Sequence, residues 1–597
     1  MTRKRHWFKD FRLKELDGGL NIRDSANDIE DKQFIKLENW NFKWNKLVNS
    51  KSLEELFNVG WNTEIQALYK TWSNEVFFVH WDKLFKDWVQ IDTPTRFVAV
   101  DTVADTTAYT VTINATPFTF VSDASATEQE ILDWLEAAIE VGWFNVIQWQ
   151  FVIDTFWETA RRWLFIDDSW SAFTINSITA NLVEDNETPL PTDNRRWNIS
   201  TWNDIIYLTS IDKDWTDNDR LFYFHNWVYG RLRLSTDGSV LNWWPTVHTV
   251  YQGKLILWGF IDNQNSLMHS KTSSITDPFL TLDFSGYNSG SQLIWNNSSI
   301  TWFQVGENWL HVFKSDEVWF SNTEKDTGTF FDFIFNKSTT TWAINQRVVT
   351  EVEQELFYYD DITKNVRRLS YEENLITLRD TSISREIETI FEQLADDQSN
   401  ATASFKYPNY KLFMRSKLSW TNVNDVALVY NVDRKSWAIE TEKLCSVSHK
   451  GLLWSSFEWV IFEDDEWVGT IGEAISKEFD FGDAIDFERF WEIEVWWAMD
   501  ETITLFVDFF VWGELKRTVQ INTKWNQTWT LWTKTLWTSI LGGDFATIWL
   551  IPFAERINLY FDWQNCNFWL RYEWLWQIEI HDVHIQHKRL KWFRIYS

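Results

Sequence analysis

The feature that most constrains this chain is an imbalance between tryptophan and glycine. The 597 residues include 44 Trp but 19 Gly, whereas glycine ordinarily makes up about 7% of a protein. Chain reversals often need a positive φ, which glycine adopts freely and a bulky side chain adopts rarely. Many of the Trp nevertheless stand between apolar runs, beside turn-forming residues: Trp72, Trp81, Trp88, Trp215, Trp227, Trp243 and Trp244.

The economical hypothesis is that most of these positions are glycine in the natural protein. Some bacterial lineages and their viruses read the codon UGA as glycine, and the 19 Gly of the sequence would then come from the ordinary glycine codons. The rival hypothesis is a surface rich in indoles that stack on sugar rings. A sugar platform needs a few convergent rings rather than one in nearly every turn, so we favour recoding.

Composition indicates a globular protein of about three domains. Charged residues make up 24% of the chain and hydrophobic residues 44%. Only Cys445 and Cys566 are present, which excludes a disulfide framework. The N-terminus lacks the apolar core of a secretory signal, and no apolar run is long enough to span a membrane, so we expect neither.

The charge argues against a protein that wraps DNA. The net charge is −31 and the isoelectric point is near 4.7, whereas binding to phosphates requires Lys and Arg. Short basic clusters occur at both ends, at Arg3–Arg5 and Lys588–Lys591. Clusters of this kind are most often solvated termini, with a partner contact as the alternative.

Short apolar runs separated by turn signals predict a mainly β protein. From about residue 187 to 470 the predicted hairpins recur about every 40 to 60 residues, a spacing compatible with four-stranded propeller blades. Strands near Ile503–Phe510, Arg517–Ile521, Ile557–Phe561 and Gln577–Ile585 predict a C-terminal β-sandwich of the jelly-roll kind. We therefore expect an N-terminal arm with the first propeller strands at 1–96, a propeller at 187–470 and a sandwich at 471–597.

Residues 97–186 predict a small α+β unit inserted into the propeller. A hairpin is expected from Ala108–Ile113 and Pro117–Val121, followed by a helix with Thr127 and Glu130 in capping-box spacing and Gly142 at its end. Two further strands are expected near Val146–Ile153 and Leu164–Ile166. A second helix is predicted separately at 384–397, behind a Ser384 cap.

With Trp read as glycine, the N-terminal sequence resembles that of tail proteins of short-tailed phages, the nozzle or tail tubular and tail-stabilisation proteins. The resemblance is carried by Leu16–Ser25, Leu37–Asn39 and Asn41–Phe42. It extends to blade-like stretches at Val250–Leu255, Ser274–Phe279 and Arg434–Ala438. The last of these stretches resembles a recurring blade end in which the tryptophan is genuine, so we expect Trp437 to be a true tryptophan. Trp319 is a second candidate for a true tryptophan.

This resemblance implies a virion structural protein of the tail, assembled in the host cytoplasm. It implies a homo-oligomeric, hexameric ring below the portal and adaptor, in contact with other tail proteins, with a central channel for DNA. An acidic channel wall would let DNA pass without retaining it. The resemblance implies no catalytic residue, no cofactor and no metal.

Motifs of catalysis and metal binding are weak in this sequence. Ser321–Phe330 is similar to the Asp-box hairpin of sialidases, which is a structural turn. Asp212–Asp219 is dense in oxygen ligands but lacks the Glu of a calcium loop, so a solvated hairpin is favoured. His581, His584 and His587 do not converge on a regular strand. No phosphate loop, zinc helix or nucleophile elbow is present.

Three functions stay open at this point. The first is a tail nozzle component, the second is a receptor- or glycan-binding tail protein that uses exposed aromatic rings, and the third is a propeller hydrolase. A hydrolase of the glycosidase type would need two positioned carboxylates. Among 86 acidic residues some pair is inevitable, so composition alone does not support it.

Overall fold

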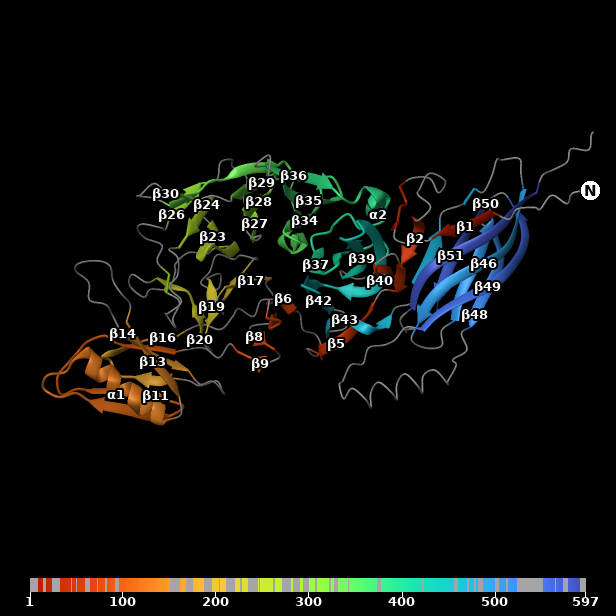
Figure 1. Ribbon diagram of the computed structural model, residues 1–597. Helices are drawn as coiled ribbons and strands as arrows, with labels where there is room; N and C mark the ends of the chain where they lie inside the picture. The colour runs from red at the N-terminus through yellow and green to blue at the C-terminus, as the bar shows by residue number, and fades with distance from the viewer. Residues whose placement is uncertain are drawn as a thin grey trace, which may run out of the picture. The chain divides into compact units, whose positions relative to one another are not determined.

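The computed structural model is mainly β, which confirms the predicted fold class at this level (Figure 1). Its described helices are α1 (Glu128–Val141), α2 (Glu388–Phe391) and the 3-10 helices η2 (Gln346–Val348) and η3 (Arg385–Ile387). The structure describes residues 9–13, 18–23, 33–43, 46–49, 51–58, 65–71, 73–80, 83–87, 89–91, 96–142, 144–150, 162–167, 175–186, 196–202, 205–210, 221–225, 228–234, 245, 247–260, 263–270, 281–282, 290–293, 300–305, 309–321, 324–326, 331–341, 343–372, 377–419, 423–455, 460–469, 472–476, 479–480, 487–499, 504–511, 514–522, 551–563, 565–572 and 578–590.

The chain forms two compact units. Unit 1 comprises Met1–Asn58, Phe357–Arg368 and Thr381–Ser597, and unit 2 comprises Val59–Leu356 and Leu369–Asp380. Each unit is therefore built from segments that are distant in sequence. The predicted domain boundaries near residues 96, 186 and 470 stay predictions.

Four of the antiparallel four-stranded sheets in the described part of unit 2 are here named meanders 1 to 4, because in each the chain generally passes from one strand to the neighbouring strand. Meander 1 has β6 (Ile65–Lys70), β7 (Val76–His80), β8 (Lys83–Lys86) and β9 (Val89–Gln90); meander 2 has β17 (Trp197–Trp202), β18 (Ile205–Ser210), β19 (Phe222–His225) and β20 (Val228–Arg231); meander 3 has β22 (Val247–Tyr251), β23 (Lys254–Phe260), β24 (Asn263–His269) and β26 (Gly290–Leu293); meander 4 has β27 (Ile300–Val305), β28 (Leu310–Lys314), β29 (Val318–Ser321) and β32 (Asn336–Thr339). Two short pairings, β21 (Arg233–Leu234) with β25 (Thr281–Leu282) and β30 (Glu324–Asp326) with β31 (Phe331–Phe333), accompany them.

Successive meanders pack face to face. The first strand of each contacts the first strand of the next, from β6 to β17, β22 and β27. One apolar core joins meanders 1 and 2, with Phe77 and Leu208 among its members, and another joins meanders 3 and 4, with Trp258 and Val312. All six residues of β18 are buried. A sheet covered on both faces explains why its sequence is continuously apolar rather than alternating.

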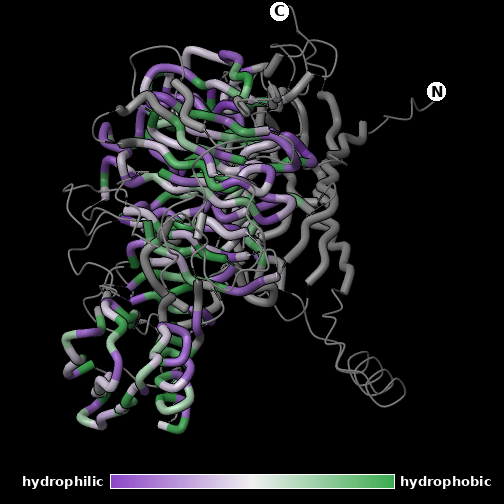
Figure 2. The backbone as a smooth tube through the Cα atoms, turned by 90° about the vertical axis from the view of Figure 1, so that its left-hand side faces the viewer, coloured by the Kyte–Doolittle hydropathy of each residue, from purple (hydrophilic) through white to green (hydrophobic). Residues whose placement is uncertain are grey.

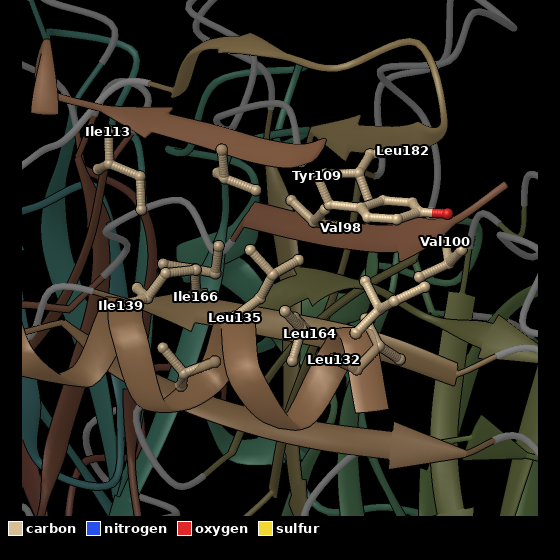
Figure 3. Close-up of a cluster of buried hydrophobic side chains, with 13 residues drawn as sticks. Val98, Val100, Tyr109, Ile113, Leu132, Leu135, Ile139, Leu164, Ile166 and Leu182 are labelled. Carbon is tan, nitrogen blue, oxygen red and sulfur yellow. The ribbon is translucent and has the colours of Figure 1, made fainter. Parts of the chain in front are cut away.

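The predicted α+β unit has a core of its own (Figure 3). Its strands form two sheets, β13 (Asn145–Gln150), β14 (Arg162–Asp167), β10 (Arg96–Val100) and β16 (Leu182–Asn186) in one, and β12 (Thr116–Val121), β11 (Ala108–Ile113) and β15 (Ile175–Ile178) in the other. Leu132, Leu135 and Ile139 of α1 are buried against strand residues such as Leu164. The predicted hairpin and helix are both confirmed.

The ends of α1 form as the sequence predicts. The Thr127 hydroxyl accepts a hydrogen bond from the Glu130 amide at 3.2 Å, and the Gly142 amide donates to the Ile139 carbonyl at 2.9 Å. Two acidic residues in the first turn, Glu128 and Glu130, complement the helix dipole. This helix is therefore specified by local sequence.

Three further four-stranded arrays follow in the sequence, named meanders 5, 6 and 7. Meander 5 has β33 (Thr350–Val352), β34 (Glu355–Asp360), β35 (Asn365–Glu372) and β36 (Thr377–Ser382); meander 6 has β37 (Thr402–Lys406), β38 (Asn409–Met414), β39 (Asn424–Asn431) and β40 (Ser436–Cys445); meander 7 has β41 (Val447–His449), β42 (Leu452–Ser455) and β43 (Val460–Gly469). The fourth strand of meander 7 is β5 (Lys51–Asn58), from the N-terminal part of the chain. Within unit 1, β37 packs on β41, as the first strands do in unit 2.

Two larger sheets complete unit 1. Meander 6 continues from β40 through β2 (Phe34–Glu38) into β44 (Gly472–Ser476), β50 (Asn565–Tyr572), β47 (Thr504–Val511) and β48 (Glu514–Asn522), with β45 (Phe479–Asp480) beside β50. The second sheet runs β3 (Trp40–Lys43), β4 (Lys46–Asn49), β51 (Ile578–Leu590), β46 (Phe487–Met499) and β49 (Ile551–Trp563), with β1 (Lys9–Leu13) beside β51. The four strands predicted after residue 500 are confirmed.

The second predicted helix, at 384–397, is wrong in its length. Only η3 and α2 form, and the chain then turns, with an isolated bridge from Leu394 to Ser416. The hydroxyl of Ser384 makes no capping bond. It accepts a hydrogen bond from the Val366 amide at 2.8 Å and donates to the Asn365 side chain at 3.2 Å. The Ser384 hydroxyl is therefore engaged in tertiary hydrogen bonds instead of capping the helix.

Polar and apolar residues are interspersed along the described strands (Figure 2). None of the helices in the described ranges combines the length and the apolar character that crossing a membrane requires. This agrees with the sequence, in which no apolar run reaches that length.

Several hairpins turn through two residues with positive φ, which defines a type I′ turn. Gln252 and Gly253 have φ values of 50° and 74°, and Glu353 and Gln354 have 48° and 70°. No described Trp has a positive φ. The Trp that the sequence places at turns, Trp72, Trp81, Trp88, Trp215, Trp227, Trp243 and Trp244, lie outside the described residues.

The strained turn of meander 5 gives a first prediction. Replacing Gln354→Gly should stabilise the β33–β34 hairpin by about 0.5–1 kcal/mol. Glycine adopts the left-handed conformation without steric cost, and this gain exceeds the additional backbone entropy that glycine loses on folding. Amide hydrogen exchange of β34 measures the local opening free energy. The control Glu355→Gly, within the strand, should lower it. Equal effects of the two glycines would contradict the assignment of strain to position 354.

Candidate functional site

The described residues among the N-terminal ones that carry the phage-tail resemblance belong to one structural element, here named the N-terminal clasp (residues 18–23 and 33–42). Gly19 has a φ of 75°. A Cβ there would lie 2.6 Å from the Ser436 Cβ and 2.9 Å from the Trp437 amide nitrogen. The next residue, Leu20, donates its amide to the Trp437 carbonyl at 2.8 Å. Glycine is therefore required where the clasp meets β40.

The two segments of the clasp are held together by backbone and side-chain bonds. The Phe34 amide donates to the Gly19 carbonyl and the Asn21 amide to the Phe34 carbonyl, both at 2.9 Å. The Asn21 side chain donates to Gln33 at 3.2 Å, and the Gln33 side chain donates to the Glu386 carboxylate at 3.5 Å. These hydrogen bonds thus replace the bonds to water that the buried side-chain amides of Asn21 and Gln33 lose on folding.

Asn39 turns the chain from β2 into β3. Its φ is 56°, a conformation that Asn tolerates better than most residues. Its amide donates to the Ile439 carbonyl at 2.7 Å. Its side chain accepts from the Thr441 amide at 2.8 Å and donates to the Thr441 hydroxyl at 3.2 Å. One residue therefore combines the turn between two sheets with a two-point attachment to β40.

The clasp joins meander 6 to the C-terminal strands. Strand β2 lies between β40, to which it is parallel at Glu38 and Ile439, and β44, to which it is antiparallel. Beyond Asn39, the Phe42 carbonyl accepts from the Asn431 side chain at 3.3 Å. These hydrogen bonds are structural. The residues that bind the clasp, Asn431, Thr441 and Glu386, could not be identified from motif spacing, because they lie more than 350 residues away in the sequence.

Both Trp residues favoured as genuine have a bonded indole. Trp437 is fully buried, donates its indole N–H to the Ile383 carbonyl at 2.8 Å and packs on Tyr430 with 4.9 Å between ring centroids. Trp319 donates to the Glu317 carboxylate at 2.7 Å.

The Glu317 carboxylate is the centre of a buried charge cluster in meander 4. Lys337 Nζ lies 2.6 Å from one of its oxygens and Lys314 Nζ lies 3.6 Å from the other. Desolvation lowers the pKa of the Lys314 ammonium, while Glu317 opposes that shift. The cluster is satisfied by its own members, so it is typical of a structural ion pair rather than of a catalytic acid.

The described part of meanders 3 and 4 contains three buried histidines, His248, His269 and His311. The surroundings of His248 and His311 are those of structural residues. His248 lies against two meander 2 residues: its Nε2–H donates to the Tyr207 carbonyl at 3.1 Å, and its Nδ1 lies 2.8 Å from the Thr209 hydroxyl. Burial lowers the pKa of His311 to about 4, and a backbone hydrogen bond at Gln304 opposes this only in part. His311 is therefore neutral in the folded protein at neutral pH.

The other candidate residues do not come together in the described part of the chain. Asp212–Asp219 and Arg3–Arg5 lie outside the described residues. Strand β51 contains His581, His584, His587, Lys588 and Arg589. Its register with β46 shifts at His581. Of Ser321–Phe330, Ser321 ends β29 and Glu324–Asp326 form β30. No group of three metal-ligating side chains occurs within the described ranges.

No known protein family matches the chain, and no curated protein matches it. Similar solved structures include an exo-β-1,3-galactanase from Phanerochaete chrysosporium, with 8% identity over 57% of this chain and 94% of that chain and a TM-score of 0.20. A family 43 arabinoxylan arabinofuranohydrolase from Bacillus subtilis has 9% identity over 66% and 95%, with a TM-score of 0.22. An apocarotenoid oxygenase from Synechocystis has 7% identity over 47% and 68%, with a TM-score of 0.24. Likeness at this level carries no conclusion about fold or activity.

The clasp gives a second prediction. Asn39→Ala should weaken the attachment of β2 and β3 to β40 by about 2–4 kcal/mol, from two lost hydrogen bonds and a strained φ. Asn39→Gly, which keeps the conformation, should cost about 1–2 kcal/mol less. Hydrogen exchange of the Thr441 amide reports both. Unchanged protection of Thr441 in the Ala variant would show that the side chain of Asn39 does not hold it.

His311 gives a third prediction. Its pKa is lower in the folded protein, about 4, than in an unfolded chain, about 6.5. Its neutral form therefore contributes fully above pH 6.5, and stability falls by up to about 1.4 kcal/mol per pH unit as the pH drops from there to pH 4. Replacement of His311→Gln should flatten the fall measured by urea unfolding between pH 6.5 and pH 4.5. Parallel curves for the two proteins would exclude His311 as the cause.

Proposed function

We propose that this chain is a structural protein of a phage tail that forms a homo-oligomeric ring around the DNA path, as nozzle or tail tubular proteins do. The observation that carries the proposal is that the residues of the resemblance are those of the clasp. A Cβ would not fit at Gly19, and Asn39 combines a left-handed backbone with two side-chain bonds to Thr441. A resemblance that coincides with a structural requirement is stronger than a similarity of composition.

We further propose that the seven meanders are blades of one β-propeller. In support, first strands pack on first strands from β6 to β27 and from β37 to β41. Blades of a propeller meet in this way at their inner edges. In addition, β5 completes meander 7 and is followed in sequence by β6, the first strand of meander 1. Such a strand exchange would tie the last blade to the start of the first.

The two large sheets of unit 1 fit a C-terminal β-sandwich in this proposal. Strands from after residue 471 make up five of the ten strands in one sheet, beside β2 and the four strands of meander 6. They make up three of the six strands in the other, beside β1, β3 and β4. The chain moves between the sheets at Asn39, as expected where one segment serves two layers.

In the proposed propeller the DNA path would run between copies rather than through one chain. The Arg347 guanidinium, which precedes β33, donates to the Gln66 carbonyl of β6 at 3.2 Å. Ala343, Val348 and Val349 of the same segment are buried. In the proposed propeller this segment would pack against the inner strands β6 and β27, which leaves the DNA path to the ring of copies.

The net charge of −31 suits a conduit that does not retain DNA. The competing glycan-binding function finds less support. Among described residues the strongly exposed large hydrophobic side chains include two aromatic ones, Tyr407 and Trp134, and these belong to different units. Sugar recognition by stacking requires rings that converge.

Electron microscopy of the phage particles, with antibody bound to this protein, tests the proposal. We expect the label around the tail axis below the portal, on a ring. A label on peripheral fibres or spikes would support the receptor-binding function instead, and its absence from particles would reject a virion role.

DNA retention gives a fourth prediction. The purified full-length protein should fail to retain duplex DNA on a filter at both low and physiological salt, because it lacks the cation density that counterion release requires. A basic DNA-binding protein serves as the positive control. Tight duplex binding at physiological salt would contradict the proposed conduit.

A further inference from the structure

Two buried tryptophans differ in one respect that burial alone does not reveal. Trp454, in the centre of meander 7, is 2% exposed, and its strand neighbours are Val447 and Ile461. Its indole nitrogen has no hydrogen-bond partner among the described residues. Trp437 is equally buried, but its indole is bonded to the Ile383 carbonyl.

The same contrast occurs in unit 2. Trp197 is 3% exposed, with its ring 5.9 Å from that of Phe222, and its indole nitrogen also has no partner within the described part of the chain. Trp319 donates to the Glu317 carboxylate, and Lys314 and Lys337 fix that carboxylate in turn. The described part of each unit thus offers a pair for comparison, one Trp with a built acceptor and one without.

Native cores seldom leave an indole N–H unsatisfied, because a buried donor without an acceptor loses its water and gains nothing. Sites that evolved around tryptophan therefore provide an oxygen for it, as Ile383 and Glu317 do. Sites that evolved around glycine have no reason to do so. Glycine within a strand is typical where a neighbouring backbone or side chain approaches closely.

We propose that positions 454 and 197 are glycine in the protein as its source makes it, whereas positions 437 and 319 are tryptophan. The proposal rests on the reading of UGA as glycine and does not depend on the tail function. It turns a statement about composition into an assignment of four individual residues, with a matched pair in each unit.

Mass spectrometry of tryptic peptides from the natural protein tests the assignment directly. Peptides Ser436–Lys443 and Ser315–Lys325 each contain a single Trp and should have the mass calculated with tryptophan. Fragment ions of Gly451–Lys477 and Trp197–Lys213 should place glycine at 454 and 197. An indole at either of those positions, or glycine at 437 or 319, would overturn the criterion.

A second test uses the chain as printed, produced with tryptophan at every position. Trp454→Gly should lower the unfolding temperature less than the matched Trp437→Gly, because both changes remove a buried ring but only the second also removes a satisfied indole hydrogen bond. Trp454→Phe keeps a ring and removes only the N–H. If Phe is tolerated at 454 while glycine destabilises as much as it does at 437, the site was built for a ring and the assignment is rejected.

Discussion

Backbone pairing between N-terminal strands and sheets formed some 400 residues later is the constraint on which unit 1 depends. Strand β2 fills the gap between β40 and β44, and β5 covers β43. Without them, the N–H and C=O groups of three strand edges would lose their partners. The N-terminal segment is therefore an internal part of the sheets, although it is translated long before they exist.

Gly19 and Asn39 allow the close backbone approach and the sharp turn that this pairing requires. At Gly19 the backbone comes so near to Ser436 that even a methyl group would collide. At Asn39 a left-handed residue redirects the chain, and its amide supplies the bonds that an unpaired turn would lack.

The buried polar groups of the described chain serve architecture. His248 ties meander 3 to meander 2, Glu317 is neutralised by two lysines, and Lys411 pairs with Glu440 at 2.9 Å within meander 6. Broken pairs of this kind are costly, while intact ones contribute more to a unique arrangement than to net stability.

The sequence by itself determined the mainly β class, the capped helix from Glu128 to Val141, and strands such as β11, β12 and β47, because apolar periodicity, caps and turn residues act over a few neighbours. Tertiary structure decided the rest. It shortened the helix expected at 384–397 by engaging Ser384 with Val366, and it placed β2 and β5 in sheets that no local pattern announces. Pairing partners and close approaches depend on residues brought together from distant parts of the chain, so they are specified only once the sheets have formed.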